Sequence, residues 1–186
     1  MSFVYPIMDQ RYEKMFIARA WAFDERAAIF YDITSLTGCR CNECIEWTIG
    51  EVKEFLKKGI ITIQQEKTGD TRDVPINKHL KKSLCMYIEG KDDWLRMFPS
   101  PKHDREVLSL KQMGRLIKRI GKDIGYPYPL GTHTGRKTFG WKLKYEEGMD
   151  EEDIKDIYGH STVKVTRRYT CIKREMVFNA VLSLRR

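Results

Sequence analysis

The sequence has 186 residues, of which 41% are hydrophobic, and a formal net charge of +8. This length fits one ordinary domain with its own core and is short for two. No apolar run approaches the roughly 18 residues of a membrane span, and the N-terminus lacks the pattern of a signal peptide. We therefore expect no membrane contact and a cytoplasmic protein, nucleoid-associated or free, whose charge favours a polyanionic partner.

Five cysteines occur in the chain, and three of them cluster at Cys39, Cys41 and Cys44. Such a cluster raises the alternative of a zinc-binding adaptor. No second pair with ligand spacing follows it, however, and free cysteine usually behaves as a small buried hydrophobe. We expect reduced thiols, with no metal and no cofactor.

The first part of the chain is expected to be helical. Helices are predicted at about 9–21 and 25–37, the second ending at Gly38. A short helix follows Arg40. Thr48 and Glu51 have the spacing of a capping box, which predicts a helix at 49–58 that ends at Gly59.

A β-hairpin is predicted next. Ile61 and Ile63 alternate with polar residues, as in a strand with one buried face. Residues 68–70 form a turn signal, and 72–76 read as the returning strand. Lys67 lies near the tip of this hairpin.

The second half returns to helices. Ser109 opens a capping box with Gln112, and a loop rich in proline and glycine follows at 125–131. Further helices are expected at about 133–147, from Asp150 to Gly159, after a Ser161 cap, and as an amphipathic tail at about 174–185. The fold class is therefore α+β, mostly helical, with one small antiparallel hairpin.

Four segments carry the motifs: T-G-C-R-C-N-E at 37–43, E-K-T-G at 66–69, H-T-G-R-K-T-F at 133–139, and G-H at 159–160 with Tyr169 nine residues after the histidine. Together they resemble the tyrosine recombinase (phage integrase) family, whose catalytic domain combines these motifs in this order. The resemblance runs from about residue 9 to the C-terminus.

Breaking a phosphodiester without metal requires a nucleophile, stabilisation of phosphoryl charge and a proton donor for the leaving alkoxide. Arg40 and Arg136 each offer a planar fork of donors suited to phosphoryl oxygens. Tyr169 is a weak nucleophile at its usual pKa near 10, but two neighbouring arginines favour the phenolate. His133 can accept or relay the phenol proton.

The remaining positions complete the predicted site. His160 can donate a hydrogen bond to a phosphoryl oxygen, and Lys67 can protonate the leaving 5′ oxygen. Glu43 is expected to be a structural partner rather than a catalytic acid. The resemblance implies these same roles, a 3′-phosphotyrosine intermediate, and no need for ATP.

The resemblance also implies partners and organisation. It implies double-stranded DNA as substrate, with no small-molecule substrate, and a tetramer on DNA in which the C-terminal tail docks on a neighbouring protomer. The alternative is that the tail packs on its own domain. We expect residues 1–186 to be a single catalytic domain with no N-terminal core-binding domain, either a naturally short recombinase or a fragment.

Two positions depart from the family pattern. Gly135 replaces an apolar residue before the second arginine, and because glycine is unfavourable in helices we expect it to loosen that segment. Tyr158 replaces the usual leucine before Gly-His. Two further alternatives are a DNA-binding regulator that keeps the fold but not the reaction, and an enzyme resembling type IB topoisomerases, which relaxes supercoils without a specific site.

Overall fold

The computed structural model of the chain describes residues 3–64, 71–102 and 106–170. Its elements are α1 (Gln10–Phe23), α2 (Glu25–Thr37), α3 (Cys41–Cys44), α4 (Ile49–Lys58), β1 (Ile60–Gln64), β2 (Thr71–Pro75), α5 (Lys78–Ile88), α6 (Leu110–Asp123), α7 (Thr134–Tyr145), α8 (Glu151–Tyr158) and α9 (Val163–Thr170). None of these helices has both the length and the apolar character needed to cross a bilayer.

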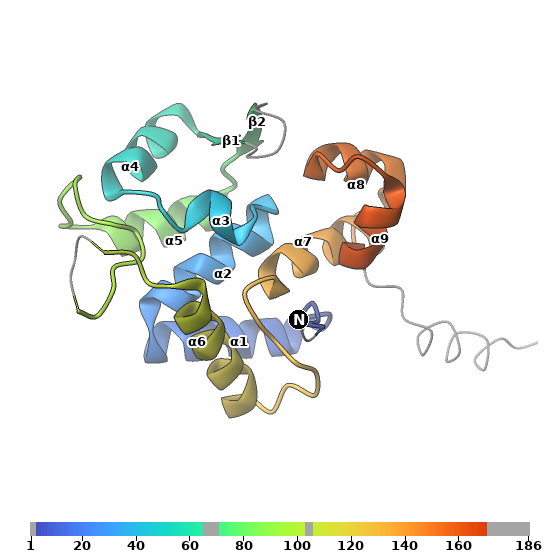
Figure 1. Cartoon of the computed structure of the whole chain (residues 1–186), viewed down its shortest axis with the longest axis horizontal. Coiled ribbons are helices and arrows are strands. Elements are labelled where there is room, and N and C mark those ends of the chain that lie inside the picture. The colour runs from blue at the N-terminus through green and yellow to red at the C-terminus, as the bar shows by residue number, and fades with distance from the viewer. Residues whose placement is uncertain (1–2, 65–70, 103–105, 171–186) are drawn as a thin grey trace, which may run out of the picture.

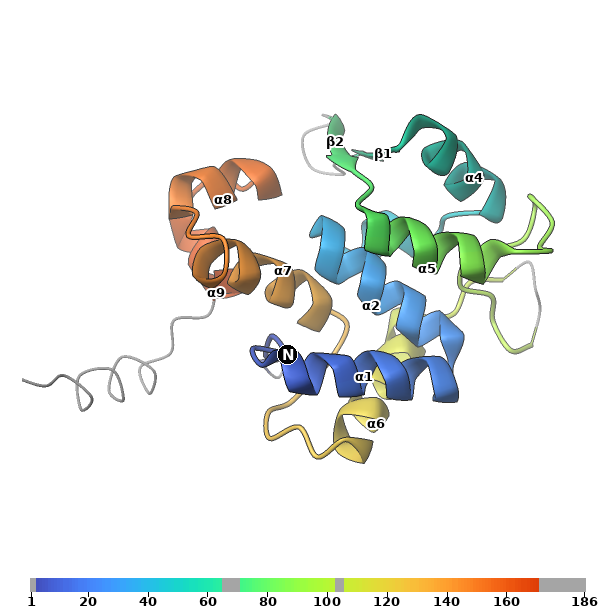
Figure 2. The ribbon, with the colours of Figure 1, turned by 180° about the vertical axis from the view of Figure 1, so that it is seen from behind.

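Helix α2 is the centre of the molecule. It lies between α1 and α5, with the start of α7 packed against its C-terminal half (Figures 1 and 2). Its side chains are buried almost all round, including Ile29, Phe30 and Ile33, as expected of a helix that is surrounded by protein. The segment that follows α2, which leads to Arg40, is therefore anchored in the core.

The helix boundaries follow the predicted start and stop signals. The capping boxes at Thr48 and Ser109 are both formed, and Gly38 and Gly159 end α2 and α8 in the left-handed conformation, with φ of 64° and 62°. The prediction that Ser161 caps α9 is wrong by one position. Helix α9 begins at Val163, so Thr162 is the residue before its first turn, and its carbonyl accepts from the amide of Val165 at 3.0 Å.

The predicted hairpin is confirmed as an antiparallel pair of β1 and β2. Ile61 lies opposite Val74 and Ile63 opposite Arg72, and both isoleucines are fully buried. The hairpin therefore turns one face toward the core. Lys67 and its turn, and the predicted tail helix at 174–185, lie outside the described residues.

The expectation that Gly135 loosens α7 is wrong. A Cβ at this position would lie 2.0 Å from Oγ1 and 2.9 Å from Cβ of Thr34, which is closer than such atoms can approach, and a tight 3.1 Å from the amide nitrogen of Ser35. Glycine lets the backbone of α7 lie directly against α2, so the close helix contact offsets the low helix propensity of this residue.

We expect Gly135→Ala to destabilise the fold by about 1–3 kcal/mol, the range for overpacking a buried site, although alanine is favoured over glycine by about 1 kcal/mol inside helices. Urea unfolding midpoints measure this. Gly114→Ala in α6 is the matched control, because its Cβ would meet its nearest neighbour at an ordinary 3.7 Å. Equal effects of the two substitutions would contradict the prediction.

Candidate active site

The predicted site residues within the described part of the chain lie at the junction of α2 and α3, at the start of α7, just after α8 and on α9. Arg40 follows the end of α2 and is the N-cap of α3, and Arg136 lies in the first turn of α7. His160 follows the end of α8, and Tyr169 lies on α9. The structure brings Arg136, His160 and Tyr169 into direct contact.

The guanidinium of Arg136 ties the ends of α2 and α8 together. It donates to the carbonyl oxygen of Gly38 and, at 3.4 Å, to that of Tyr158. The residue is only 1% exposed, and burial lowers the pKa of Arg136. Its buried Nε has no hydrogen-bond partner among the described residues.

His160 is held in one tautomer. Its Nε2 lies 3.0 Å from an Nη2 of Arg136, and since arginine only donates, Nε2 must accept. The proton is therefore on Nδ1, which donates to Thr166 Oγ1 at 3.0 Å. Burial, with the charge of Arg136 next, lowers the pKa of His160 to about 3. In this arrangement the imidazole is neutral and orients Arg136, and its only N–H is directed at Thr166.

This depressed pKa predicts acid sensitivity. Between about pH 6.5 and 3 the unfolded chain binds a proton at His160 that the folded chain does not, so stability falls with pH by at most about 1.4 kcal/mol per unit. Urea midpoints at pH 7 and pH 5 measure the loss. His160→Gln should make the difference between them smaller, because the imidazole that resists protonation in the folded chain is removed. An equal difference in wild type and His160→Gln would contradict the prediction.

Tyr169 lies beside this pair. The centroid of its ring is 5.1 Å from Cζ of Arg136 and 5.1 Å from the imidazole centroid of His160. Helix α9 is fastened to α8 by an ion pair of 2.6 Å between Arg167 and Glu151. The half-buried ring of Tyr169 is therefore next to the guanidinium of Arg136.

Arg40 is held by Glu43. The carboxylate accepts from the Arg40 backbone amide at 2.7 Å and from its guanidinium at 2.6 Å. The Glu43 side chain is 2% exposed and that of Arg40 31%. One carboxylate thus fixes both the backbone and the side chain of Arg40, while part of the guanidinium stays open to solvent.

Arg72 is a site residue that the sequence reasoning missed. It lies on β2, donates to the carbonyl oxygen of Ile157 at 2.9 Å and approaches Glu43 to 3.9 Å. Burial lowers its pKa. The signal was available, because residues directly opposite in an antiparallel pair share a face and Arg72 is opposite the buried Ile63.

His133 is the N-cap residue of α7, and its ring nitrogens lie 3.8 and 3.9 Å from Cys41 Sγ. Burial, followed by the charges of Arg136 and Lys137, lowers the pKa of His133. In the ranges that the structure describes, no group of three or more His, Cys, Asp or Glu side chains is placed to hold a metal. Cys39, Cys41 and Cys44 are buried free thiols.

A sequence model of the phage integrase family matches residues 9–176. The chain belongs to this family. The match covers most of the chain and contains every predicted site residue, including Lys67.

Several curated tyrosine recombinases are similar to this integrase-family chain. It is 28% identical to the tyrosine recombinase XerA of Pyrococcus furiosus over 78% of this chain and 50% of the relative. It is 25% identical to XerC of Bacillus subtilis over 79% of this chain and 49% of the relative. The chain thus spans about half the length of these relatives.

Solved recombinase structures share the fold. A crystal structure of XerA recombinase aligns with a TM-score of 0.71 at 24% identity, over 98% of this chain and 66% of that one. A lambda integrase dimer bound to a COC′ core site aligns with a TM-score of 0.69 at 17% identity, over 92% of this chain and 49% of that one. The predicted fold, a tyrosine recombinase catalytic domain, is confirmed.

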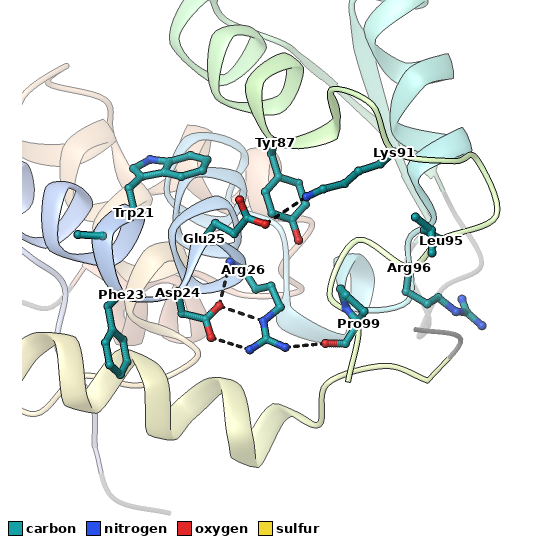
Figure 3. Close-up of a pocket in the computed structure, with 11 residues that line it drawn as sticks. Trp21, Phe23, Asp24, Glu25, Arg26, Tyr87, Lys91, Leu95, Arg96 and Pro99 are labelled. Carbon is teal, nitrogen blue, oxygen red and sulfur yellow. Dashed lines mark hydrogen bonds and ion pairs between the residues drawn. The ribbon is translucent and has the colours of Figure 1, made fainter. Parts of the chain in front are cut away.

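A separate cavity of about 540 Å³ lies between the α1–α2 junction, the end of α5 and residues 95–99 (Figure 3). Its polar groups are already satisfied: Arg26 binds Asp24 and the carbonyl of Pro99, and Lys91 lies 3.4 Å from the ring centroid of Tyr87. None of the predicted catalytic residues of this integrase-family domain lines it.

Proposed function

We propose that this chain is a site-specific DNA recombinase that cuts and rejoins strands through a 3′-phosphotyrosine bond to Tyr169. The observation that carries the proposal is the phenol ring of Tyr169 lying 5.1 Å from Cζ of the buried Arg136. The family match and the recombinases that the chain resembles support it.

The reaction follows from the chemistry of these groups. Tyr169 Oη attacks the scissile phosphorus, forming the phosphotyrosine bond as the bond to the 5′ oxygen breaks. Arg40 and Arg136 stabilise the charge on the non-bridging oxygens. The phenol proton passes to His133, and Lys67 supplies a proton to the leaving 5′ oxygen.

The electrostatics support this division of roles. A lowered pKa keeps His133 neutral near pH 7 and able to accept a proton. The covalent intermediate retains the energy of the phosphodiester, so attack by a second 5′-hydroxyl reseals DNA without ATP or metal. Glu43 acts by holding Arg40 in position.

The proposed partners are double-stranded DNA and further copies of the chain. A net charge of +8 favours the phosphate backbone. We propose a tetramer on DNA in which the tail at about 174–185 docks on a neighbouring protomer, in the cytoplasm where its DNA substrate lies.

The test is covalent trapping on a nicked suicide duplex that carries the cognate site, taken from the DNA that flanks the gene. The top strand loses a short fragment after cleavage, so resealing is prevented. The expected result is an adduct that survives denaturing electrophoresis, forms equally in excess EDTA, and yields a phosphotyrosine peptide containing Tyr169. Site binding without an adduct would contradict the proposal.

A second candidate is a DNA-binding regulator with weak or no catalysis. It is favoured by one observation: Arg136 donates to two protein carbonyls and to His160, so most of its donors are already engaged. This candidate predicts specific, salt-sensitive binding to the same duplex and no adduct at any protein concentration.

A further inference from the structure

Tyr158 contacts three residues of the candidate site. It is the last residue of α8 and is fully buried. Cζ of Arg136 lies over its ring, 4.2 Å from the centroid. The imidazole of His160 stacks on the same ring at 4.9 Å and 22°, and the ring of Tyr169 is 5.5 Å away. One side chain therefore touches the arginine, the histidine and the nucleophile.

The phenol hydroxyl adds a second attachment to the same arginine. It donates to the backbone carbonyl of Arg136, so Tyr158 contacts this residue at both its main chain and its guanidinium. A ring face beside a desolvated cation is a favourable electrostatic contact. The two contacts together restrict how far the guanidinium can move relative to the start of α7.

The surrounding helices leave room for this phenol. A Cβ at Gly140 would lie 2.5 Å from the Tyr158 hydroxyl, and one at Gly38 would lie 3.0 Å from its ring and still closer to Phe139. Glycine at both positions provides the space that the tyrosine ring fills. Tyr158 is thus matched to its neighbours rather than being an ordinary apolar filler.

We propose that Tyr158 is a positioning residue for strand cleavage, which sets the guanidinium of Arg136 for the scissile phosphate both directly and through the imidazole of His160. The inference rests on the proposed recombinase function and deepens it. Misplacement of such groups by about 1 Å costs roughly 100-fold in rate, so a side chain that contacts both has a large effect on cleavage without touching the DNA.

The first test compares Tyr158→Leu with Tyr158→Phe in the full chain. Leucine removes both the ring face and the hydroxyl, whereas phenylalanine keeps the ring. Single-turnover cleavage of the nicked duplex should slow roughly 30- to 100-fold in the leucine variant and recover to within about fivefold of wild type with phenylalanine. The Kd for the uncut duplex should stay within about threefold in both.

A second readout separates positioning from general damage. Sulfur is substituted for each non-bridging oxygen of the scissile phosphate in turn, and the ratio of the two cleavage rates reports how the guanidinium faces them. Tyr158→Leu should change this ratio at least threefold. A loss of folded protein lowers both rates equally and leaves the ratio unchanged.

Tyr87→Leu is the matched control. Tyr87 is also buried, donates to a backbone carbonyl, that of Met97, and has a cation, Lys91, over its ring, but it lies at the separate cavity (Figure 3). Tyr87→Leu should leave the ratio of the two cleavage rates, the sulfur ratio, unchanged. It should slow cleavage only in proportion to the fraction of the protein that is unfolded.

If Tyr158→Leu does not fold, Gly140→Ala tests the same contact, because its methyl group would press on the phenol hydroxyl. Cleavage should slow, and adding Tyr158→Phe should restore it. The inference is overturned if Tyr158→Leu cleaves within threefold of wild type, if Tyr87→Leu changes the sulfur ratio as much, or if Tyr158→Phe gives no recovery in either background. Absence of an adduct from wild-type protein overturns the recombinase proposal itself, and this inference with it.

Discussion

Tyr169→Phe is expected to abolish the covalent protein–DNA adduct while DNA binding is retained. Removing the nucleophile of a covalent mechanism lowers the rate by at least about 10⁴-fold. Phenylalanine keeps the ring that contacts His160 and Arg136, so the substitution removes one oxygen atom and little packing. The measurement is adduct yield on the suicide duplex over hours, alongside the Kd for the uncut site and the unfolding midpoint.

Tyr145→Phe provides the control for loss of a phenol. Tyr145 lies on α7 and is 41% exposed, and adduct formation should be unchanged in this variant. An adduct that persists in Tyr169→Phe would assign the nucleophile to another residue. Such a result would contradict the proposed phosphotyrosine bond to Tyr169.

Local chemistry explains why most element boundaries could be predicted. Gly38 and Gly159 end their helices because the chain turns there with positive φ, which glycine adopts without strain. The capping boxes at Thr48 and Ser109 satisfy amide groups of the helix they open. Such signals involve residues three or four apart, so the sequence alone contains them.

The close contacts between elements could not be predicted in this way. Gly135 was interpreted through helix propensity, a local property, but its role depends on how near α7 lies to α2. The partners of Arg72 come from α2, α8 and the segment at Glu43, which meet only in three dimensions. The register of the hairpin was the one clue in the sequence.

For the candidate site, the sequence supplied residue types and order but not hydrogen-bonding roles. His160 was expected to donate to a phosphoryl oxygen, whereas its Nε2 accepts from Arg136 and its N–H is directed at Thr166. That tautomer follows from the packing of α7 against α8 and α9. The motif supplies the histidine and the arginine, but only the fold places Nε2 of the histidine against a guanidinium that can only donate.

Arg136→Lys should reduce cleavage by about 10²–10³-fold, the usual effect of losing one preorganised donor to a developing oxyanion. Lysine keeps the charge but replaces a planar fork with a single point charge. It also leaves some of the groups that Arg136 now binds, the carbonyls of Gly38 and Tyr158 and the imidazole of His160, without a donor. Each such loss costs roughly 1–3 kcal/mol, so the variant should also be less stable.

These two effects are separated by measuring single-turnover cleavage well below the unfolding midpoint of the variant, with saturating DNA. Arg19→Lys is the matched control, because Arg19 makes a two-donor contact with Asp123, at 3.1 and 2.6 Å, on the surface between α1 and α6. It should cleave at the wild-type rate. If folded Arg136→Lys also cleaves within tenfold of wild type, a charge at this position is sufficient, and the oriented fork of donors is not what stabilises the transition state.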